Sequence, residues 1–527
     1  GSNALGGAIH FVSPTGYSSD RLRLRLDGGS FGLRRAQLAG SAQNGSYDAH
    51  MTASSLDNDG FRAHGEGKST RGAANFGWRI SPNVETRLYL IGADLDQRIP
   101  GSLTREQALR QPRLAAAGNL NLDYQRNMQS WRVASKTTLR SDLATFELGG
   151  YAIEKQLIHP IFQYLDYQYE DRGAFLRASF NPTLGPYANR LVIGANLFEG
   201  HIDNQQFQNL PGAQRGTLLS AAKDRSDNLA LYAENQLLLR PGLSLITGLQ
   251  YLDASRERKD RFENDVDTSG AQNYDFFNPK LGVLWELAHG NQVFANLSRS
   301  AEAPSFGELN FTNAALAETR AQRATTLEIG TRGTRESLSW DVAIYRAELR
   351  NEFQFFDLGG GSFSVTNADD TVHQGIEAGL DWSFAQNLLA AGDRSSLRLA
   401  YAFNDFFFDN DVSWGSNELP GAPRHFLRGE LRYAHLSGAY VAPQVEWVPQ
   451  GYDVDNANLT QTRDYALLGL RAGYEAASGW SVYIDARNLA DTKYIASSSV
   501  AALASASSAL FEPGDGRAIF GGLSFRW

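Results

Sequence analysis

The sequence has no cysteine among its 527 residues and only two methionines. Without cysteine there are no disulfides, no thiolate metal sites and no cysteine nucleophiles, and little remains to bind a soft metal. No apolar run reaches the roughly 18 residues that a membrane-spanning helix needs. The formal net charge is −9, which argues against a nucleic-acid partner, because phosphate binding needs a basic face.

Enzymatic motifs are also missing. The chain contains neither GxSxG nor HExxH, and its nine histidines are scattered. The acidic stretches at 57–60 and 409–411 lack the downstream glutamate of a calcium loop, and the glycine-rich stretch at 359–362 lacks the Lys-Ser/Thr of a phosphate cradle. We therefore predict no catalytic residues, no metal site and no cofactor, and expect that the protein is not an enzyme.

What the chain does contain is strand periodicity along its whole length. In DRLRLRLDGG, at 20–29, three leucines alternate with three arginines, and similar alternation recurs at 397–404, 480–487 and 519–527. Side chains of a strand point alternately to its two faces, so each stretch predicts a ribbon with one apolar and one polar face. A soluble sandwich would place the leucines in a protein core, whereas a membrane barrel would place them in lipid.

Short turn signals divide these strands at a regular interval. Ten of them begin at residues 42, 80, 136, 183, 239, 287, 333, 385, 434 and 475. Longer polar or aromatic segments, such as 153–173 and 201–226, lie between them and predict loops at the opposite end. With both chain ends on one side, ten short turns imply 22 strands. We predict an all-β fold: a transmembrane antiparallel β-barrel over 19–527, with short periplasmic turns and long extracellular loops.

Two features favour the membrane barrel over a soluble β-rich binding protein. Aromatic residues such as Trp447 and Tyr474 lie near predicted strand ends, where interfacial girdles form. The chain also stops on Trp527 directly after an alternating strand, and a terminal aromatic residue is typical of outer-membrane barrels.

Several longer stretches resemble TonB-dependent outer-membrane receptors. GSNALGGAIHFVSPTG at the N-terminus resembles the last segment of that family's plug domain. Barrel motifs of the family resemble NLSRSAEAPSFGELN at 296–310, TTLEIGTRG at 325–333, HQGIEAGLDW at 373–382, ARNLADTKYIASS at 486–498 and PGDGRAIFGGLSFRW at 513–527. The resemblance implies that residues 1–18 are the C-terminal remnant of a plug domain. It also implies that contact with the TonB complex belongs to a region ahead of residue 1.

The resemblance further implies a transporter in the bacterial outer membrane, surrounded by lipid and lipopolysaccharide. A ferric siderophore or similar bulky iron chelate is the expected cargo, as the commonest ligand class of the family. Receptors for haem, cobalamin or an oligosaccharide remain alternatives, as does a passive plugless porin-like channel. The stretch 304–330 lacks the Asn-Pro-Asn-Leu segment and the histidine usual in haem receptors.

The predicted ligand-binding residues lie in LIHPIFQYLDYQYEDR, at 157–172. This stretch gathers His159, Phe162, Tyr164, Tyr167 and Tyr169 at the top of a strand and its loop. Stacking aromatic rings with a few hydrogen-bond donors suit a flat, bulky chelate. The alternative is that these rings pack in an interfacial girdle and its loop.

The alternating arginines carry a second site prediction. If the leucines at 20–29 face lipid, then Arg21, Arg23 and Arg25 point into the lumen. Desolvated cations there need carboxylate or carbonyl partners. We predict that these three side chains face the plug.

Overall fold

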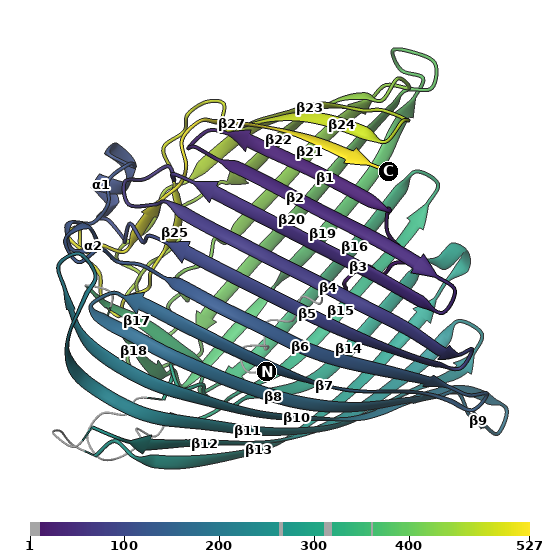
Figure 1. The fold of residues 1–527 in the computed structure, drawn as a ribbon, viewed down its shortest axis with the longest axis horizontal. Helices are drawn as coiled ribbons and strands as arrows, with labels where there is room; N and C mark the ends of the chain where they lie inside the picture. Colours follow the sequence, from purple (N-terminus) through teal and green to yellow (C-terminus); the bar gives the residue numbers. More distant parts are fainter. Residues whose placement is uncertain (1–10, 263–266, 310–318, 360–361) are drawn as a thin grey trace.

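The wall of the protein is one antiparallel sheet that closes on itself. The computed structural model describes residues 11–527 except 263–266, 310–318 and 360–361. Strand β1 (Leu22–Gly29) pairs with β27 (Ala518–Arg526), so the first and last strands seal the barrel (Figure 1). The sheet has 23 strands, and the two-residue strand β9 only extends the turn before β10, which leaves the predicted 22 strands in the wall.

The strands and helices follow one another along the chain with few interruptions. The wall strands of the first half, with β9, are β1, β2 (Arg34–Asn44), β3 (Tyr47–Asn58), β4 (Gly67–Ser81), β5 (Val84–Gln97), β6 (Asn127–Arg140), β7 (Ala144–Pro160), β8 (Gln163–Phe180), β9 (Thr183–Leu184), β10 (Tyr187–Leu210), β11 (Gln214–Arg240), β12 (Leu243–Asp260) and β13 (Gly270–Glu286). Those of the second half are β14 (Gln292–Glu302), β15 (Gln322–Arg335), β16 (Leu338–Arg350), β19 (Asp370–Gln386), β20 (Arg394–Phe408), β21 (His425–Ala434), β22 (Ala439–Val448), β23 (Tyr465–Glu475), β24 (Trp480–Arg487) and β27. The loops carry α1 (Arg105–Arg110), α2 (Ala117–Asn121), β17 (Phe353–Gly359), β18 (Ser362–Asn367), β25 (Ile495–Ser498) and β26 (Phe511–Pro513), and a 3-10 turn, η1 (Ala288–Gly290), follows β13.

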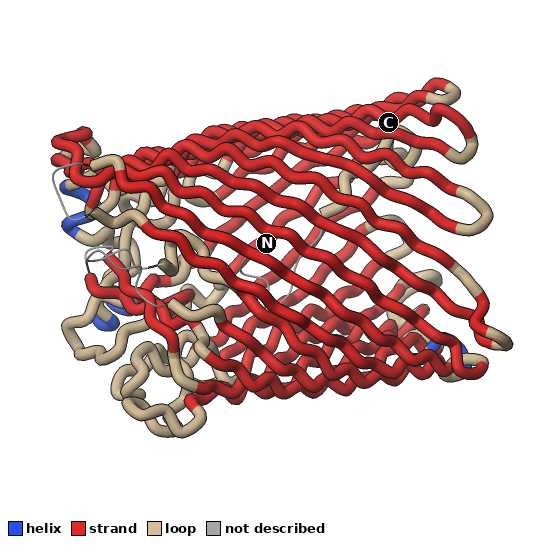
Figure 2. The backbone as a smooth tube through the Cα atoms, turned by 90° about the horizontal axis from the view of Figure 1, so that it is seen from below, coloured by secondary structure: helices blue, strands red, loops and turns tan. Residues whose placement is uncertain are grey.

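All ten predicted short turns join neighbouring wall strands at one end of the barrel, the turn end. Figure 2 shows these turns at one end, with α1, α2 and most of the irregular backbone at the other, the loop end. Tight reversals need left-handed backbone, which glycine adopts without strain. Gly45, with φ 56°, supplies it between β2 and β3, and Gly479, with φ 93°, between β23 and β24.

Two predicted long loops are wrong. Within 153–173 the strands β7 and β8 continue almost to their connection, and within 201–226 the strands β10 and β11 do the same. The polar and aromatic residues that indicated a loop keep their alternation and pair across the strands. Backbone pairing therefore continues to within a few residues of each connection. Both segments are β-hairpins that extend the barrel wall at the loop end.

Strand β13 shows how the alternation separates the two faces. Phe277, Leu281 and Trp285 are exposed on the outer surface. Between them, Lys280 points inward and its Nζ lies 2.9 Å from Glu234 Oε2 of β11. Apolar side chains thus face the lipid and ion pairs face the lumen, as the membrane-barrel interpretation requires.

The loop end has a small apolar core of its own. Leu103 and Ala108 of the β5–β6 loop pack with Val454, Ile495 and Phe511 from the loops after β22 and β24. Helix α1 is held by a capping box, in which Thr104 and Gln107 exchange hydrogen bonds. Among the described residues, no helix is long and apolar enough to cross a membrane.

Candidate functional site

A cavity of about 1510 Å³ opens inside the barrel and is lined by residues of β6–β8, of β10–β14 and of the loop after β14. It exceeds the roughly 300–1,000 Å³ of ordinary small-molecule pockets. We call it the main cavity. The tall hairpins β7–β8 and β10–β11 supply much of its wall, so the segments wrongly predicted as loops position it.

Of the five predicted ligand-binding residues, three line the main cavity: Phe162, Tyr167 and Tyr169. The rings of Tyr167 and Tyr169 meet edge to face at 6.3 Å. His159 and Tyr164 lie outside the lining set, and His159 Nδ1 lies 2.5 Å from the backbone oxygen of Gln125. The structure therefore brings Phe162, which precedes β8, and two residues of β8 into one cavity lining and leaves the other two members of the set outside it. Ligand binding by the five remains a prediction.

The cavity also has cationic side chains that the sequence analysis did not single out. Arg132 and Lys155 line it, and in the described part of the chain neither has a carboxylate within 4.0 Å. The Lys155 Nζ instead lies 3.6 Å from the centre of the Tyr169 ring. An ammonium over an aromatic face is attracted by the ring but keeps its donors available. Asp171 lines the same cavity and attracts both from a longer distance, so two cations and one carboxylate face the space there.

Two further arginines of β12 line the same cavity and are more firmly fixed. Arg258 makes two hydrogen bonds of 2.6 and 2.7 Å to Asp224, which neutralises it. Arg256 is buried, and it donates to the backbone oxygen of Pro304 at 3.0 Å and to Asn228 Oδ1 at 2.9 Å. Arg256 thus ties the β14–β15 loop to the wall without meeting a carboxylate in these contacts.

Glu302, at the loop end of β14, is a buried acid of the cavity with one oxygen unpaired in the described part of the chain. It is only 4% exposed. Gln322 donates to its Oε2 at 2.8 Å, whereas its Oε1 has no hydrogen-bond partner among the described residues. A buried carboxylate oxygen left unpaired is costly unless a ligand supplies a donor. The signal was present in the sequence, because Glu302 directly precedes the Ala-Pro of the family-like motif at 296–310.

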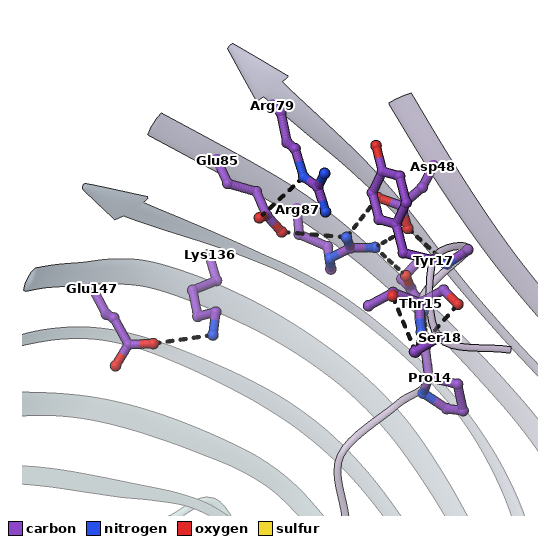
Figure 3. Close-up of polar contacts among 12 residues, drawn as sticks. Pro14, Thr15, Tyr17, Ser18, Asp48, Arg79, Glu85, Arg87, Lys136 and Glu147 are labelled. Atoms are coloured by element: carbon purple, nitrogen blue, oxygen red, sulfur yellow. Dashed lines mark hydrogen bonds and ion pairs between the residues drawn. The ribbon is translucent and has the colours of Figure 1, made fainter. Parts of the chain in front are cut away.

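A second inner surface holds the N-terminal segment against the wall near the turn end (Figure 3). The Gly16 backbone N–H donates to Asp48 Oδ2 at 2.7 Å, and Asn75 donates to the backbone oxygen of Pro14 at 2.8 Å. The guanidinium of Arg79 lies 3.7 Å from the centre of the Tyr17 ring. Residues 14–17 are therefore fastened inside the barrel by two neighbouring strands, β3 and β4.

The anchor point of that segment is a buried ion pair. Arg87 of β5 donates to both oxygens of Asp48 on β3, at 2.9 and 2.7 Å, and to Asn75 Oδ1 at 2.6 Å. Asp48 is 2% exposed and Arg87 is 5% exposed. Gly77 on the intervening strand leaves room, since a Cβ there would collide with both partners. The two-pronged geometry and the extra donors satisfy charges that would otherwise be costly to bury.

The predicted plug-facing arginines lie partly at a second cavity of about 750 Å³ at the turn end. Arg23 and Arg25 line it, whereas Arg21 precedes β1 and lies outside the lining set. Their partners are acids of the same stretch: Arg23 lies 2.8 Å from Asp20 and Arg25 lies 2.9 Å from Asp27. Both arginines point inward as expected. Contact of the three with a plug remains a prediction.

Comparisons with known proteins agree on the architecture. The family model described as "TonB dependent receptor-like, beta-barrel" matches residues 14–489. The Pseudomonas aeruginosa (strain UCBPP-PA14) protein named metal-pseudopaline receptor CntO is 22% identical over 93% of this chain and 74% of its own length. The vitamin B12 transporter BtuB of Photobacterium profundum is 23% identical over 47% of this chain and 42% of its own length.

Solved structures are similar over almost the whole chain. The siderophore receptor PiuA of Acinetobacter baumannii superposes with a TM-score of 0.80 at 14% identity, over 97% of this chain and 82% of that one. The ferric citrate transporter FecA gives a TM-score of 0.81 at 14% identity, over 96% of this chain and 78% of that one. At such low identity these likenesses show the fold.

Proposed function

Since this chain belongs to the family of TonB-dependent receptor-like β-barrels, we propose that it imports a metal chelate of anionic character across the bacterial outer membrane. A ferric siderophore is the default class of cargo. The observation that carries the proposal is the pair of cations without a carboxylate of the described residues within 4.0 Å, Arg132 and Lys155, beside aromatic rings in a cavity larger than ordinary pockets. The relative matched over 93% of this chain is named as a metal-pseudopaline receptor, which supports a metal chelate, whereas the vitamin B12 transporter is matched over only 47%.

The residues of the main cavity offer three kinds of contact to such a cargo: stacking, charge attraction and hydrogen bonding. The faces of Tyr167 and Tyr169 offer stacking area for flat metal-binding groups. Arg132 and Lys155 attract carboxylates or catecholate oxygens, and a partly desolvated site strengthens that attraction. The free oxygen of Glu302 accepts a hydrogen bond from an amine or hydroxyl of the ligand scaffold. Energy for release would come through the TonB complex.

Other nutrients make different demands on the same cavity. An oligosaccharide needs stacking faces and neutral hydrogen bonds but gains little from Lys155. Cobalamin is bulky and would depend mainly on area, and a passive channel would show no saturable binding. We therefore expect ferric citrate, as an anionic probe, to bind saturably to the purified barrel, and cyanocobalamin and maltohexaose to bind at least about 10-fold more weakly. Quenching of tryptophan fluorescence measures all three, and equal or absent binding of the probes would reject the proposal.

Replacing Lys155 tests the charge directly. We expect Lys155→Gln to weaken ferric citrate binding about 10-fold, because a hydrogen bond to a charged group contributes about 1.5–3 kcal/mol and 1.4 kcal/mol is tenfold. Lys259→Gln is the matched control, since Lys259 is exposed, pairs with Glu257 at 3.3 Å and lies outside the cavity lining. If the two variants bind the probe equally well, Lys155 does not recognise the cargo.

Glu302→Gln tests the effect of the negative charge in the site. The substitution keeps the shape and removes the charge, so we expect tighter binding of ferric citrate, by about 3- to 10-fold, because a carboxylate no longer repels it. A cationic chelate such as ferrioxamine B, which carries an ammonium group, should bind more weakly to the same variant. Parallel titrations of the two chelates give the comparison, and a change in the same direction for both would show that Glu302 acts only through folding.

A further inference from the structure

The loop end holds a small oxygen-lined cavity that is separate from the main cavity. Its volume is about 400 Å³, and it is lined by Glu418, Gln450, Gly451, Asp453, Asn458 and Gln461. Glu418 belongs to the β20–β21 loop and the other five to the β22–β23 loop. Every member of the lining offers a side-chain or backbone oxygen, and none is a cation.

The two loops are already joined in a way that leaves this cavity open. The backbone N–H of Glu418 donates to Asn458 Oδ1 at 2.8 Å, and Asn458 Nδ2 donates back to the Glu418 backbone oxygen at 2.9 Å. The Gly421 N–H donates to the Asp453 backbone oxygen at 2.8 Å. These bonds use backbone and amide groups, so the carboxylates of Glu418 and Asp453 are left to face the cavity.

Asp453 is the observation that points to a ligand. The residue is 6% exposed, yet its Oδ1 is buried without a hydrogen-bond partner in the described part of the chain. The same cavity lining thus holds a buried carboxylate with one unpaired oxygen and a second carboxylate, that of Glu418.

We propose that this cavity is a calcium site that clamps the β20–β21 loop to the β22–β23 loop. Calcium takes 6–8 oxygen ligands, mixes carboxylates with amide and backbone oxygens, and tolerates irregular geometry, whereas magnesium demands a near-ideal octahedron. No group of three or more His, Cys, Asp or Glu side chains suited to a metal occurs among the described residues. The two carboxylates would therefore be supplemented by neutral oxygens of Gln450, Gly451, Asn458 and Gln461.

Glu418 serves two partners in this arrangement. Its Oε1 lies 2.8 Å from Arg424, which also contacts Asp405 at 2.7 Å. The second oxygen of Glu418 remains for the cation. With few carboxylates and one of them shared, the affinity should fall in the range of extracellular calcium modules, with a Kd on the order of 10⁻⁴–10⁻³ M.

The proposed site lies next to the apolar core of the loop end. Val454, next to Asp453, belongs to the apolar core of the loop end, together with Leu103 and Phe511 from two other loops. The Ala501 N–H donates to the Val454 backbone oxygen at 3.0 Å. A cation held by Asp453 would therefore order a rim built from four loops. This inference does not depend on the proposed cargo.

Titration of calcium into the protein tests the site. The barrel is refolded in detergent and titrated with CaCl₂ by calorimetry, with MgCl₂ as the comparison. Lipopolysaccharide is left out because its phosphates would also bind the cation. We expect one saturable calcium site, and at least about 10-fold weaker binding in Asp453→Asn and in Glu418→Gln. Asp464→Asn is the control, because Asp464 lies in the same loop, is 65% exposed at its side chain and is not one of the lining residues. Absence of saturable binding in the unsubstituted protein, or unchanged binding in Asp453→Asn, would overturn the proposal.

Thermal unfolding with and without calcium distinguishes whether Asp453 binds the metal or only supports the fold. Without calcium, we expect Asp453→Asn to be at least as stable as the unsubstituted protein, because it removes an unpaired buried charge. With 10 mM CaCl₂, only the unsubstituted protein and Asp464→Asn should gain thermal stability. Equal gains in Asp453→Asn, or its failure to fold while Glu418→Gln binds calcium normally, would assign Asp453 a structural role instead.

Discussion

Leu281→Arg should lower the free energy of unfolding of the barrel in a lipid bilayer by about 2–4 kcal/mol, the cost of an arginine at the bilayer midplane of such a barrel. Leu281 is 51% exposed on the outer face of β13. It lies four residues from Phe277, which packs on Tyr251 with ring centres 4.9 Å apart, and four residues from Trp285 near the turn end. The two aromatic levels mark the membrane interfaces and place Leu281 midway between them.

The same substitution at the edge of the apolar belt is the control. Leu287 is 39% exposed and directly follows β13 at the turn end. Leu287→Arg should cost only about 0–1 kcal/mol, because an arginine near the interface reaches water. Equilibrium urea unfolding of the barrel refolded into phospholipid vesicles measures both variants. Equal costs at the two positions would contradict the assignment of the outer face to lipid.

Asp48→Ala should destabilise the barrel by about 3–5 kcal/mol, the cost of leaving one member of a buried ion pair without its partner. Arg87 would lose both of its bonds to Asp48 and keep Glu85, at 3.3 Å, as its remaining carboxylate partner, while it stays 5% exposed inside the wall. The Gly16 N–H would lose its acceptor at the same time. We therefore expect faster proteolysis of the N-terminal segment in vesicles, as well as a lower urea midpoint.

Another inner-wall acid, also drawn in Figure 3, is the matched control. Glu147 lies 3.1 Å from Lys136 and 3.2 Å from Arg177, but both cations are about two-fifths exposed at their side chains. Glu147→Ala should cost about 0–1 kcal/mol, because water screens partly exposed pairs. The double variant Asp48→Ala/Arg87→Met should recover part of the loss, since it leaves no buried charge unpaired. If Asp48→Ala costs no more than Glu147→Ala, the buried pair does not hold the anchor.

The outcomes along the chain show where sequence reasoning succeeds in this protein. All ten short turns were predicted at their positions, because a reversal of two wall strands needs a local signal of a few residues. The inward direction of Arg23 and Arg25 followed from strict alternation. The loops of 153–173 and 201–226 were predicted wrongly, because polarity indicates distance from lipid and does not show whether the backbone continues to pair.

The candidate sites were harder to predict than the wall. Phe162, Tyr167 and Tyr169 could be grouped from the sequence because they crowd one short stretch, and all three line the main cavity, while their binding of a ligand stays a prediction. Lys155 belongs to the neighbouring strand and becomes a partner of Tyr169 only through the register of β7 with β8. Glu302 is far from both in the sequence, and curvature of the wall brings it to the same cavity.

By itself the sequence determined the class of fold, the number of wall strands, the face that each strand turns to lipid and the family. These depend on a period of two residues and on turn residues, which are local properties of the chain. Only the tertiary structure decided the pairing of Asp48 with Arg87, 39 residues apart, and the meeting of Glu418 with Asp453 across two loops. The physical reason is that closure of the barrel brings distant strands and loops together, and no local pattern records which polar groups then face one another.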